Sequence, residues 1–257
     1  MSRKTNKACL KDLKDVNKLL TKMREHKSRI VFENLGDKKD LVIYSVTDAS
    51  YKQEEKSIAG QILMLGTSKT NKVNILYWKS KTIERVCESS KDAEARGLTV
   101  AVDTAKFLTS QMEFMWFGEN KNKIPIKMFT DNIPVLQSIA SSTQTKNKYL
   151  RNSYASFKQH LEYGEVESYS WIDGEKMIAD IMTKEKTSSS VQGKLMRKLV
   201  ESNEFKEGKS NYNEVKWKND EIVLENKKDK ELQKKTLDED KEKLKNNFGE
   251  PPGNDTQ

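Results

Sequence analysis

Residues Leu41–Ser50 read LVIYSVTDAS and carry the β-branched and aromatic side chains typical of a buried strand. Since alternate side chains of a strand share a face, Asp48 is expected beside Tyr44 and Val46 on an apolar face. A carboxylate in such surroundings is unfavourable unless it is paired, hydrogen-bonded or bound to a metal. The stretch therefore predicts a buried strand that carries an acid with a functional role.

The segments that follow this strand predict a sheet with helices packed on it. Ser57–Gly66 and Val73–Ser80 share its strand character, which indicates a three-stranded antiparallel meander. A long helix is expected to begin near Ser89, because Ser89 and Asp92 have the spacing of a capping box and apolar residues follow at helical intervals. The later patterns are a strand at Ile126–Asp131, helices at Ile133–Ala140 and Lys148–Tyr163, a strand at Val166–Ile172 and a helix from Glu175. This order predicts an α+β or α/β fold.

The chain divides by composition into three parts. Residues 1–30 are rich in lysine and have apolar residues at three-to-four spacing, so an amphipathic helix is expected to lead into the domain. Residues 31–203 carry the strand and helix patterns and form the predicted globular domain. Residues 204–257 mix Lys, Glu, Asp and Asn with few large apolar residues, a composition too polar to bury a core. A charged tail, either a solvated helix or disordered, is expected there.

The composition also restricts the kind of functional site. The chain has 257 residues, a formal net charge of +8 and a sequence pI near 9.1, which favours polyanionic partners. No stretch is apolar over the roughly 20 residues that cross a bilayer, so no membrane partner is expected. Cys9 and Cys87 lie in no zinc-binding spacing, and neither His26 nor His160 has a partner at a recognisable spacing. A site built from carboxylates is therefore expected.

Three further acids are expected to point inward together with Asp48. Glu94 lies four residues before Leu98 and so extends the core-facing stripe of the predicted helix. Asp131 ends its strand, where sheets of this class commonly expose reactive groups. Asp180 lies within the sequence MIADIM, the most apolar setting of any acid in the chain. Because carboxylates without histidine suit hard cations, the four acids predict a site for Mg²⁺, with Mn²⁺ as an alternative.

Each acid taken alone has a structural alternative, which is to cap a turn or to pair with a lysine at the domain edge. Helical phase or a turn setting is expected to direct four competing acids toward solvent, namely Glu88, Asp92, Asp103 and Asp173. Basic residues after the third strand and before a later helix offer phosphate contacts, with a solvated basic face as the alternative. These candidate substrate contacts are Lys79, Lys81, Arg85, Lys146, Lys148 and Arg151, together with Asn132 beside the third acid.

Five segments of the predicted domain form a series. They are Tyr44–Tyr51 (YSVTDASY), Tyr77–Lys81 (YWKSK), Glu88–Ala95 (ESSKDAEA), Phe129–Asn132 (FTDN) and Trp171–Lys184 (WIDGEKMIADIMTK). In order and spacing, from about residue 31 to about residue 199, the series resembles the ribonuclease H domain of copia-type (LTR) retrotransposon Pol polyproteins. Asp92 and Ala95 stand where many relatives have Glu and an aromatic residue, and the turn before Asp180 lacks the His of cellular ribonucleases H.

The resemblance implies a ribonuclease-H-like fold, with a five-stranded mixed sheet and helices on both sides. It implies that Asp48, Glu94, Asp131 and Asp180 are the catalytic residues and bind two Mg²⁺ ions. The implied activity is endonucleolytic hydrolysis of the RNA strand of RNA–DNA hybrids during reverse transcription, leaving 5′-phosphate ends. The implied partners are the hybrid and a reverse-transcriptase domain of the same polyprotein, and the implied location is a cytoplasmic virus-like particle or the nucleus.

Three other functions are consistent with these residues, and one of them is an assembly protein that acts mainly through its Lys/Glu-rich tail. A decayed or domesticated element would keep a ribonuclease-H-like nucleic-acid-binding module without cleavage, although four intact acids argue against this. A different nuclease of the same fold would share an acidic two-metal site but cut duplex DNA or a junction. Composition does not separate RNA cleavage from DNA cleavage, because that choice rests on contacts to the 2′-hydroxyl.

Overall fold

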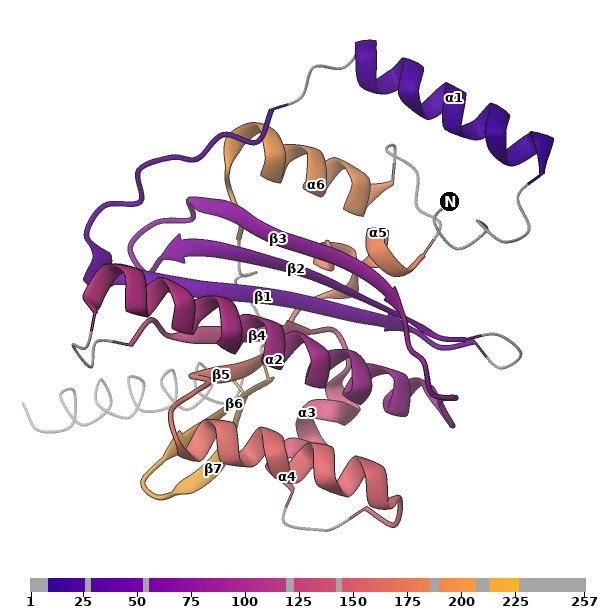
Figure 1. The fold of residues 1–257 in the computed structure, drawn as a ribbon. Coiled ribbons are helices and arrows are strands. Elements are labelled where there is room, and N and C mark those ends of the chain that lie inside the picture. The colour runs from indigo at the N-terminus through magenta and orange to yellow at the C-terminus, as the bar shows by residue number, and fades with distance from the viewer. Residues whose placement is uncertain are drawn as a thin grey trace, which may run out of the picture.

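A seven-stranded sheet forms the centre of the molecule (Figure 1). The structure is a computed structural model and describes residues 9–25, 29–52, 56–118, 123–141, 145–184, 190–206 and 213–226. The strands are β1 (Leu41–Ser50), β2 (Ile58–Thr67), β3 (Val73–Thr82), β4 (Ile126–Thr130), β5 (Ser168–Trp171), β6 (Asn213–Lys218) and β7 (Glu221–Asn226). They lie in the order β3-β2-β1-β4-β5-β6-β7. β1 is antiparallel to β2 and parallel to β4, so the sheet is mixed.

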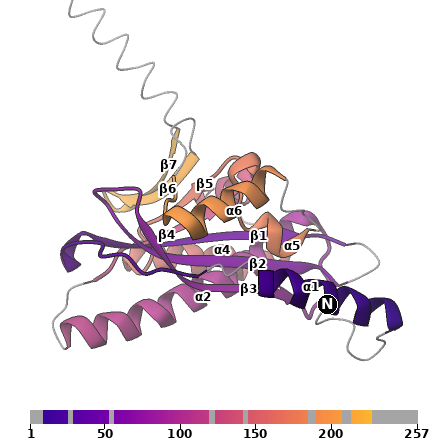
Figure 2. The same ribbon diagram turned by 90° about the horizontal axis from the view of Figure 1, so that it is seen from above.

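Helices cover both faces of this sheet (Figures 1 and 2). The α-helices are α1 (Leu10–Glu25), α2 (Ser90–Phe117), α3 (Ile133–Ala140), α4 (Lys148–Glu162), α5 (Asp180–Thr183) and α6 (Val191–Ser202), and the short 3-10 helices are η2 (Lys38–Asp40) and η3 (Gly174–Lys176). One apolar cluster joins the sheet to α2, α3 and α4, and a second joins it to α6 and the segment that leads into α5. The predicted class, an α+β fold with a mixed sheet flanked by helices, is confirmed.

β1 is apolar on both faces because both faces are covered. Ile43 is fully buried on the side of α2, α3 and α4. Tyr44 and Val46 belong to the cluster on the opposite side, where Tyr44 also contacts Phe129 and Phe205. The alternation expected for this strand is therefore present, and it places Asp48 at the end of the row that faces α5.

The start of α2 follows the predicted capping pattern. The Ser89 side chain accepts a hydrogen bond from Asp92 N at 3.2 Å, which satisfies one of the free backbone donors of the first turn. The Asp92 carboxylate in turn accepts from Glu88 N at 3.0 Å, one residue earlier than in a regular capping box. These contacts begin the helix at Ser90, so Glu94 lies early in α2.

The expectations of a five-stranded sheet and of a charged tail from residue 204 are corrected by β6 and β7. Val215 is fully buried, and Trp217, Ile222 and Leu224 pack against the apolar cluster on the side of α2, α3 and α4. The two strands are joined at Asn219 and Asp220, whose φ angles of 50° and 61° are those of a type I′ hairpin turn. Lysines and glutamates beside these residues conceal the two strands in the average composition. Residues 227–257 lie outside the described part of the chain.

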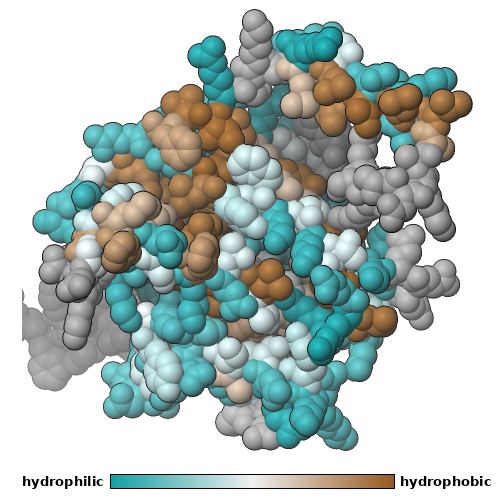
Figure 3. Space-filling view, viewed as in Figure 1, coloured by the Kyte–Doolittle hydropathy of each residue, from teal (hydrophilic) through white to brown (hydrophobic). Residues whose placement is uncertain are grey.

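The amphipathic helix expected near the N-terminus is present as α1. None of its residues is buried, and its apolar side chains form a row on the molecular surface (Figure 3). Leu10, Leu13 and Met23 are the most exposed of them, at 78%, 58% and 63%. Among the helices that the structure describes, none is both long enough and apolar enough to span a membrane.

The hairpin formed by β6 and β7 gives a test of the corrected domain boundary. Val215→Ala removes two buried methyl groups and is expected to lower the free energy of unfolding by about 2 kcal/mol. Urea denaturation measures this difference. The matched control is Val223→Ala on β7, where the half-buried side chain is expected to lose less than about 1 kcal/mol. Equal small effects at both positions would show that the hairpin does not fold with the sheet.

Candidate metal centre

Two of the predicted acids lie level with each other at the carboxyl ends of neighbouring parallel strands. Val46 on β1 pairs with Phe129 on β4, so Asp48 and Asp131, each two residues further on, reach the same edge of the sheet. Asp48 is 1% exposed. Asp131 follows the last residue of β4 and is half-buried. The parallel register thus brings together two carboxylates that lie 83 residues apart in the chain.

A third acid reaches this edge because a glycine lets α5 approach the sheet. Gly60 on β2 pairs with Asp48 on β1. A Cβ atom at position 60 would lie 2.6 Å from Met182 Cβ and 2.9 Å from Thr183 Cγ2, closer than real side chains pack. Only glycine therefore permits α5 to sit where it does. Asp180, the first residue of α5, is buried beside the two strand acids as a result.

These three acids form a compact cluster of oxygen ligands. Asp48, Asp131 and Asp180 each offer a carboxylate oxygen, and these oxygens all lie within 4.8 Å of one another. Oxygen donors without histidine or cysteine suit Mg²⁺ or Mn²⁺. The donor set therefore fits the divalent ions expected from the sequence, and the acids that would hold them come from β1, the end of β4 and α5.

Glu94 borders the cluster but does not belong to it. Its side chain is 5% exposed on the core-facing side of α2, as its helical phase predicts. Burial raises the pKa of Glu94 well above its usual value, and the nearby carboxylates of Asp48 and Asp131 raise it further. A hydrogen bond from the backbone of Ala49 opposes this shift. Glu94 is therefore in electrostatic contact with the cluster from the opposite face of the sheet.

Three neighbours of the acids were not among the predicted site residues. The Thr183 hydroxyl donates to Asp48 Oδ2, and Trp171 Nε1 donates to the backbone oxygen of Asp131 at 3.1 Å. Lys184 forms an ion pair with Asp180, and its Nζ also lies 3.8 Å from Asp48 Oδ1. The signal for Thr183 and Lys184 was their position three and four residues after Asp180, on the same side of a helical turn.

Burial dominates the electrostatics of the cluster. It raises the pKa of Asp48 to about 6, although the Thr183 hydrogen bond and the Lys184 charge act in the opposite direction. Burial also raises the pKa of Asp131, again against the Lys184 charge. The pKa of Lys184 itself is raised despite its partial burial, because it pairs with Asp180 and faces Asp48 and Asp131. The acids thus disfavour a fully charged state without a cation.

The competing acids behave as predicted with one exception. Glu88 and Asp103 are exposed, and Asp173 is an exposed turn residue that accepts a hydrogen bond from Glu175 N at 2.9 Å. Asp92, which was expected to face solvent, is 1% exposed. The prediction was wrong because Arg96, one helical turn later, pairs with the Asp92 carboxylate at 2.7 Å and allows it to be buried.

The predicted phosphate contacts differ in their exposure and in the contacts that they make. Lys79 is half-buried, and Lys81, Lys146, Lys148 and Arg151 are exposed. Asn132 is engaged in the fold, since its side chain caps α3 by accepting from Val135 N at 3.1 Å. The most structured of them is Arg85, which lies over the Tyr149 ring at 5.9 Å, the ring that Arg96 also contacts at 3.6 Å.

Arg85 also lines a concave surface beside the start of α2. Lys81, Arg96 and Tyr149 border the same cavity, whose volume is about 240 Å³. Ala59 contributes to its wall, one residue before Gly60 on β2. The cavity thus places three basic side chains and one aromatic ring near β2, the strand whose Gly60 lies against α5.

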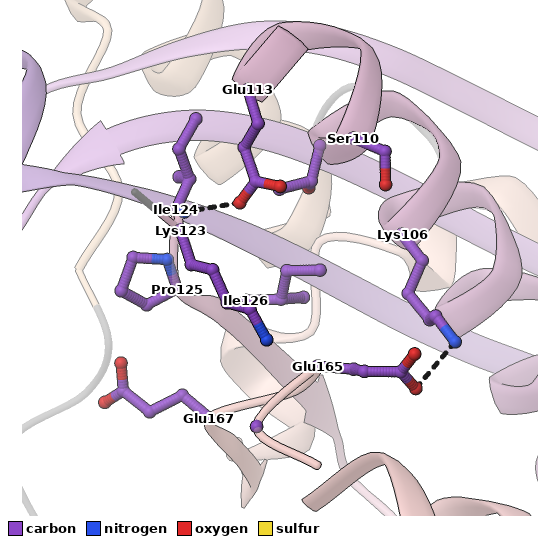
Figure 4. A pocket seen from close by; sticks show the side chains of 11 residues that line it. Lys106, Ser110, Glu113, Lys123, Ile124, Pro125, Ile126, Glu165 and Glu167 are labelled. Carbon is purple, nitrogen blue, oxygen red and sulfur yellow. Dashed lines mark hydrogen bonds and ion pairs between the residues drawn. The ribbon is translucent and has the colours of Figure 1, made fainter. Parts of the chain in front are cut away.

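A second cavity, of about 420 Å³, lies at the opposite end of β4 (Figure 4). It is lined by Ile126 at the start of the strand, whereas Asp131 follows the end of the strand. Lys106 and Glu165 form an ion pair across it at 2.7 Å. Beside them His160, for which no carboxylate, Ser or Cys partner was recognised from its spacing in the sequence, contacts Glu165 at 2.5 Å and Ser156 at 3.1 Å. The sequence reading therefore missed both partners of His160, and His26 lies outside the described residues.

Comparison with known proteins finds similarity in solved structures alone. No family model matches the chain, and no curated protein matches it. Ribonuclease H1 LC11, isolated from compost by a metagenomic approach, is 17% identical with a TM-score of 0.40, and the match covers 61% of this chain and 99% of that one. Ribonuclease H1 of the halophilic archaeon Halobacterium salinarum is 15% identical with a TM-score of 0.40, and the match covers 55% of this chain and 92% of that one. The N-terminal ribonuclease H domain of rv2228c from Mycobacterium tuberculosis is 16% identical with a TM-score of 0.41, and the match covers 60% of this chain and 99% of that one.

The raised pKa of Asp48 predicts how the stability of the metal-free protein depends on pH. The folded protein binds a proton at Asp48 more readily than the unfolded chain, so stability should fall as the pH rises from 3.8 to about 6. The shift corresponds to about 3 kcal/mol for this group. Urea denaturation in a chelator at several pH values measures it. The free energy of unfolding of Asp48→Asn should not show this decrease. The same dependence of that free energy on pH in both proteins would contradict the prediction.

Proposed function

We propose that the protein is a ribonuclease H, a metal-dependent endonuclease that hydrolyses the RNA strand of RNA–DNA hybrids. The single observation that supports this most is the cluster of Asp48, Asp131 and Asp180, whose carboxylate oxygens lie within 4.8 Å of one another at one edge of the sheet. These acids follow one another along the chain in the same order as in the retrotransposon ribonuclease H domains that the sequence resembles. The proposal includes a copia-type retrotransposon origin, a reverse-transcriptase domain as partner and a location in a cytoplasmic virus-like particle or the nucleus.

In this proposal the acids bind metal and do not attack the substrate. Asp48, Asp131 and Asp180 would hold Mg²⁺, or Mn²⁺ in its place, and Glu94 would complete the site from α2. The chemistry that such a pair of ions would supply is activation of a water and stabilisation of the charge on the leaving 3′ oxygen. The contribution of the chain is orientation, because Thr183 fixes the Asp48 carboxylate and Trp171 fixes the backbone at Asp131.

Charge supports a polyanionic substrate at this edge. The chain carries a net charge of +8, and the cavity beside α2 is bordered by Lys81, Arg85 and Arg96. Arg96 is held by its ion pair with Asp92 and its stacking on Tyr149, so its position is defined before a substrate binds. Arg85 lies over the Tyr149 ring and is exposed, so its guanidinium group is accessible to a phosphate. We propose that this surface holds the backbone of the hybrid while the acids meet the scissile phosphate.

Asp131→Asn tests the enzyme directly. Loss of one ligand charge is expected to reduce cleavage of a labelled RNA–DNA hybrid in Mg²⁺ by about 100-fold or more. The matched control is Asp103→Asn, the same change at an exposed acid of α2, which should keep wild-type activity. Products should carry 5′-phosphate and 3′-hydroxyl ends. Binding of the hybrid without cleavage by the wild-type protein would instead support the non-catalytic module.

The choice of substrate is tested with the same preparation. Wild-type protein is given the hybrid, duplex DNA of the same sequence and a four-way junction under identical Mg²⁺. The proposal expects cleavage of the RNA strand of the hybrid and intact DNA in the other two. Preferential cutting of duplex DNA or of the junction would replace it with another nuclease of the same fold.

Arg85→Ala tests the proposed binding surface. Loss of one phosphate contact should weaken binding of the hybrid and reduce the slope of log Kd against log salt by about 1. Because Arg85 does not contact the acid cluster in the structure, kcat should change little. Lys69→Ala serves as control, since Lys69 lies in the turn between β2 and β3, at the other end of these strands from the cavity, where it pairs with Asp40 of η2. An unchanged salt slope for Arg85→Ala would exclude this surface.

A further inference from the structure

A lysine side chain reaches into the cluster of acids that the proposed function assigns to metal. Lys184 Nζ forms an ion pair with Asp180 on its own helical turn and lies 3.8 Å from Asp48 Oδ1 on β1. It also acts electrostatically on Asp131. A surface pair spaced by four residues contributes little to stability. Here both carboxylates are almost fully buried, at 4% and 1% exposed, so the lysine compensates charges that water does not screen.

Lys184 is placed so that its ammonium group can leave without disturbing the acids. It is the C-cap residue of α5, with an extended backbone at φ −118° and ψ 153°. Its backbone N–H donates to Asp180 O at 2.9 Å, which holds the end of the helix independently of the side chain. The side chain is 41% exposed, whereas the neighbouring Thr183 is buried. The flexible four-carbon stem can therefore swing into solvent while the backbone stays in place.

We propose that Lys184 is the counter-cation of the metal-free site, holding Asp48 and Asp180 together until a divalent cation replaces its ammonium group. The inference rests on the proposed function, because it assumes that the cluster binds metal. It assigns to Lys184 a role in positioning the acids and in setting metal affinity, through competition between one charged side chain and the metal for the same oxygens. A purely structural ion pair would stay in place with or without metal.

The proposal makes stability depend on metal in a specific way. Lys184→Met keeps the length of the side chain and removes its charge. Without metal this variant should unfold at a lower urea concentration than wild type, because the acids lose their counter-cation. With saturating Mg²⁺ the two proteins should unfold at the same concentration. Mg²⁺ should also bind the variant about tenfold more tightly, since a competing unit charge near 4 Å is absent.

Calorimetric titration with Mg²⁺ and urea denaturation in chelator or in saturating Mg²⁺ measure both effects. Lys176→Met is the matched control, because Lys176 is an exposed lysine of η3 on the same side of the sheet and should change neither quantity. Lys184→Arg keeps the charge and should restore the stability of the metal-free protein. An equal loss of stability with and without metal, or weaker Mg²⁺ binding by Lys184→Met, would overturn the inference while leaving the proposed function standing.

A second measurement uses the wild-type protein and does not depend on the folding of a variant. Amine labelling with a succinimidyl ester, mapped by mass spectrometry, compares Lys184 with Lys176 in the presence and absence of Mg²⁺. Release of the ammonium group should raise the labelling of Lys184 severalfold in Mg²⁺ and leave Lys176 unchanged. Unchanged labelling of Lys184 in protein that calorimetry shows to bind Mg²⁺ contradicts the inference alone. Protein that binds no Mg²⁺ contradicts the proposed function as well.

Discussion

Three carboxylates have oxygens within 4.8 Å of one another, and two of them are almost wholly removed from water, so a nearby cation is needed to compensate their charge. Much of the local structure follows from this constraint. The Thr183 hydroxyl and the Lys184 ammonium are aimed at the acids, and Trp171 secures the backbone at Asp131. The cluster is costly to build, and the fold builds it from three separate elements whose oxygens could hold a metal ion.

The sheet makes that convergence possible through register and not through sequence proximity. Asp48 and Asp131 meet because β1 and β4 are parallel and paired at Val46 and Phe129, so both strands end at one edge. Asp180 belongs to α5, on the face of the sheet that α6 covers. Glu94 belongs to α2, on the other face. Four elements thus meet at one point of the sheet edge. Basic side chains border the cavity near this edge, so carboxylates that could hold a cation lie near Lys81, Arg85 and Arg96.

Much of this arrangement could be predicted because it is written in local patterns. The alternation of β1 placed Asp48 on an apolar face, and helical phase placed Glu94 toward the core. What failed depended on contacts between distant residues. Asp92 is buried because Arg96 neutralises it while stacking on Tyr149 of α4, a contact that no local pattern shows. The role of Lys184 required knowing that α5 lies against β1 and β2.

The hairpin of β6 and β7 failed for a different reason. On β6 the apolar Val215 and Trp217 alternate with charged residues, and on β7 the apolar run from Ile222 to Leu224 is flanked by Glu221 and Glu225, so the average composition concealed both strands. The Asn219–Asp220 pair, a favourable two-residue turn, was the overlooked signal. Composition over a long window therefore describes solubility better than it describes strands.

Gly60 carries a consequence for how related chains are recognised. It has no functional group, yet any side chain there would collide with Met182 and Thr183 and push α5 away from Asp48. The geometry of the acids is thus encoded partly in a residue that no chemical argument would select. A homologue that kept all four acids but replaced this glycine would still have the side chains of the site, but they would no longer lie close together. Glycine at this position is therefore a sharper criterion for an intact centre than the acids counted alone.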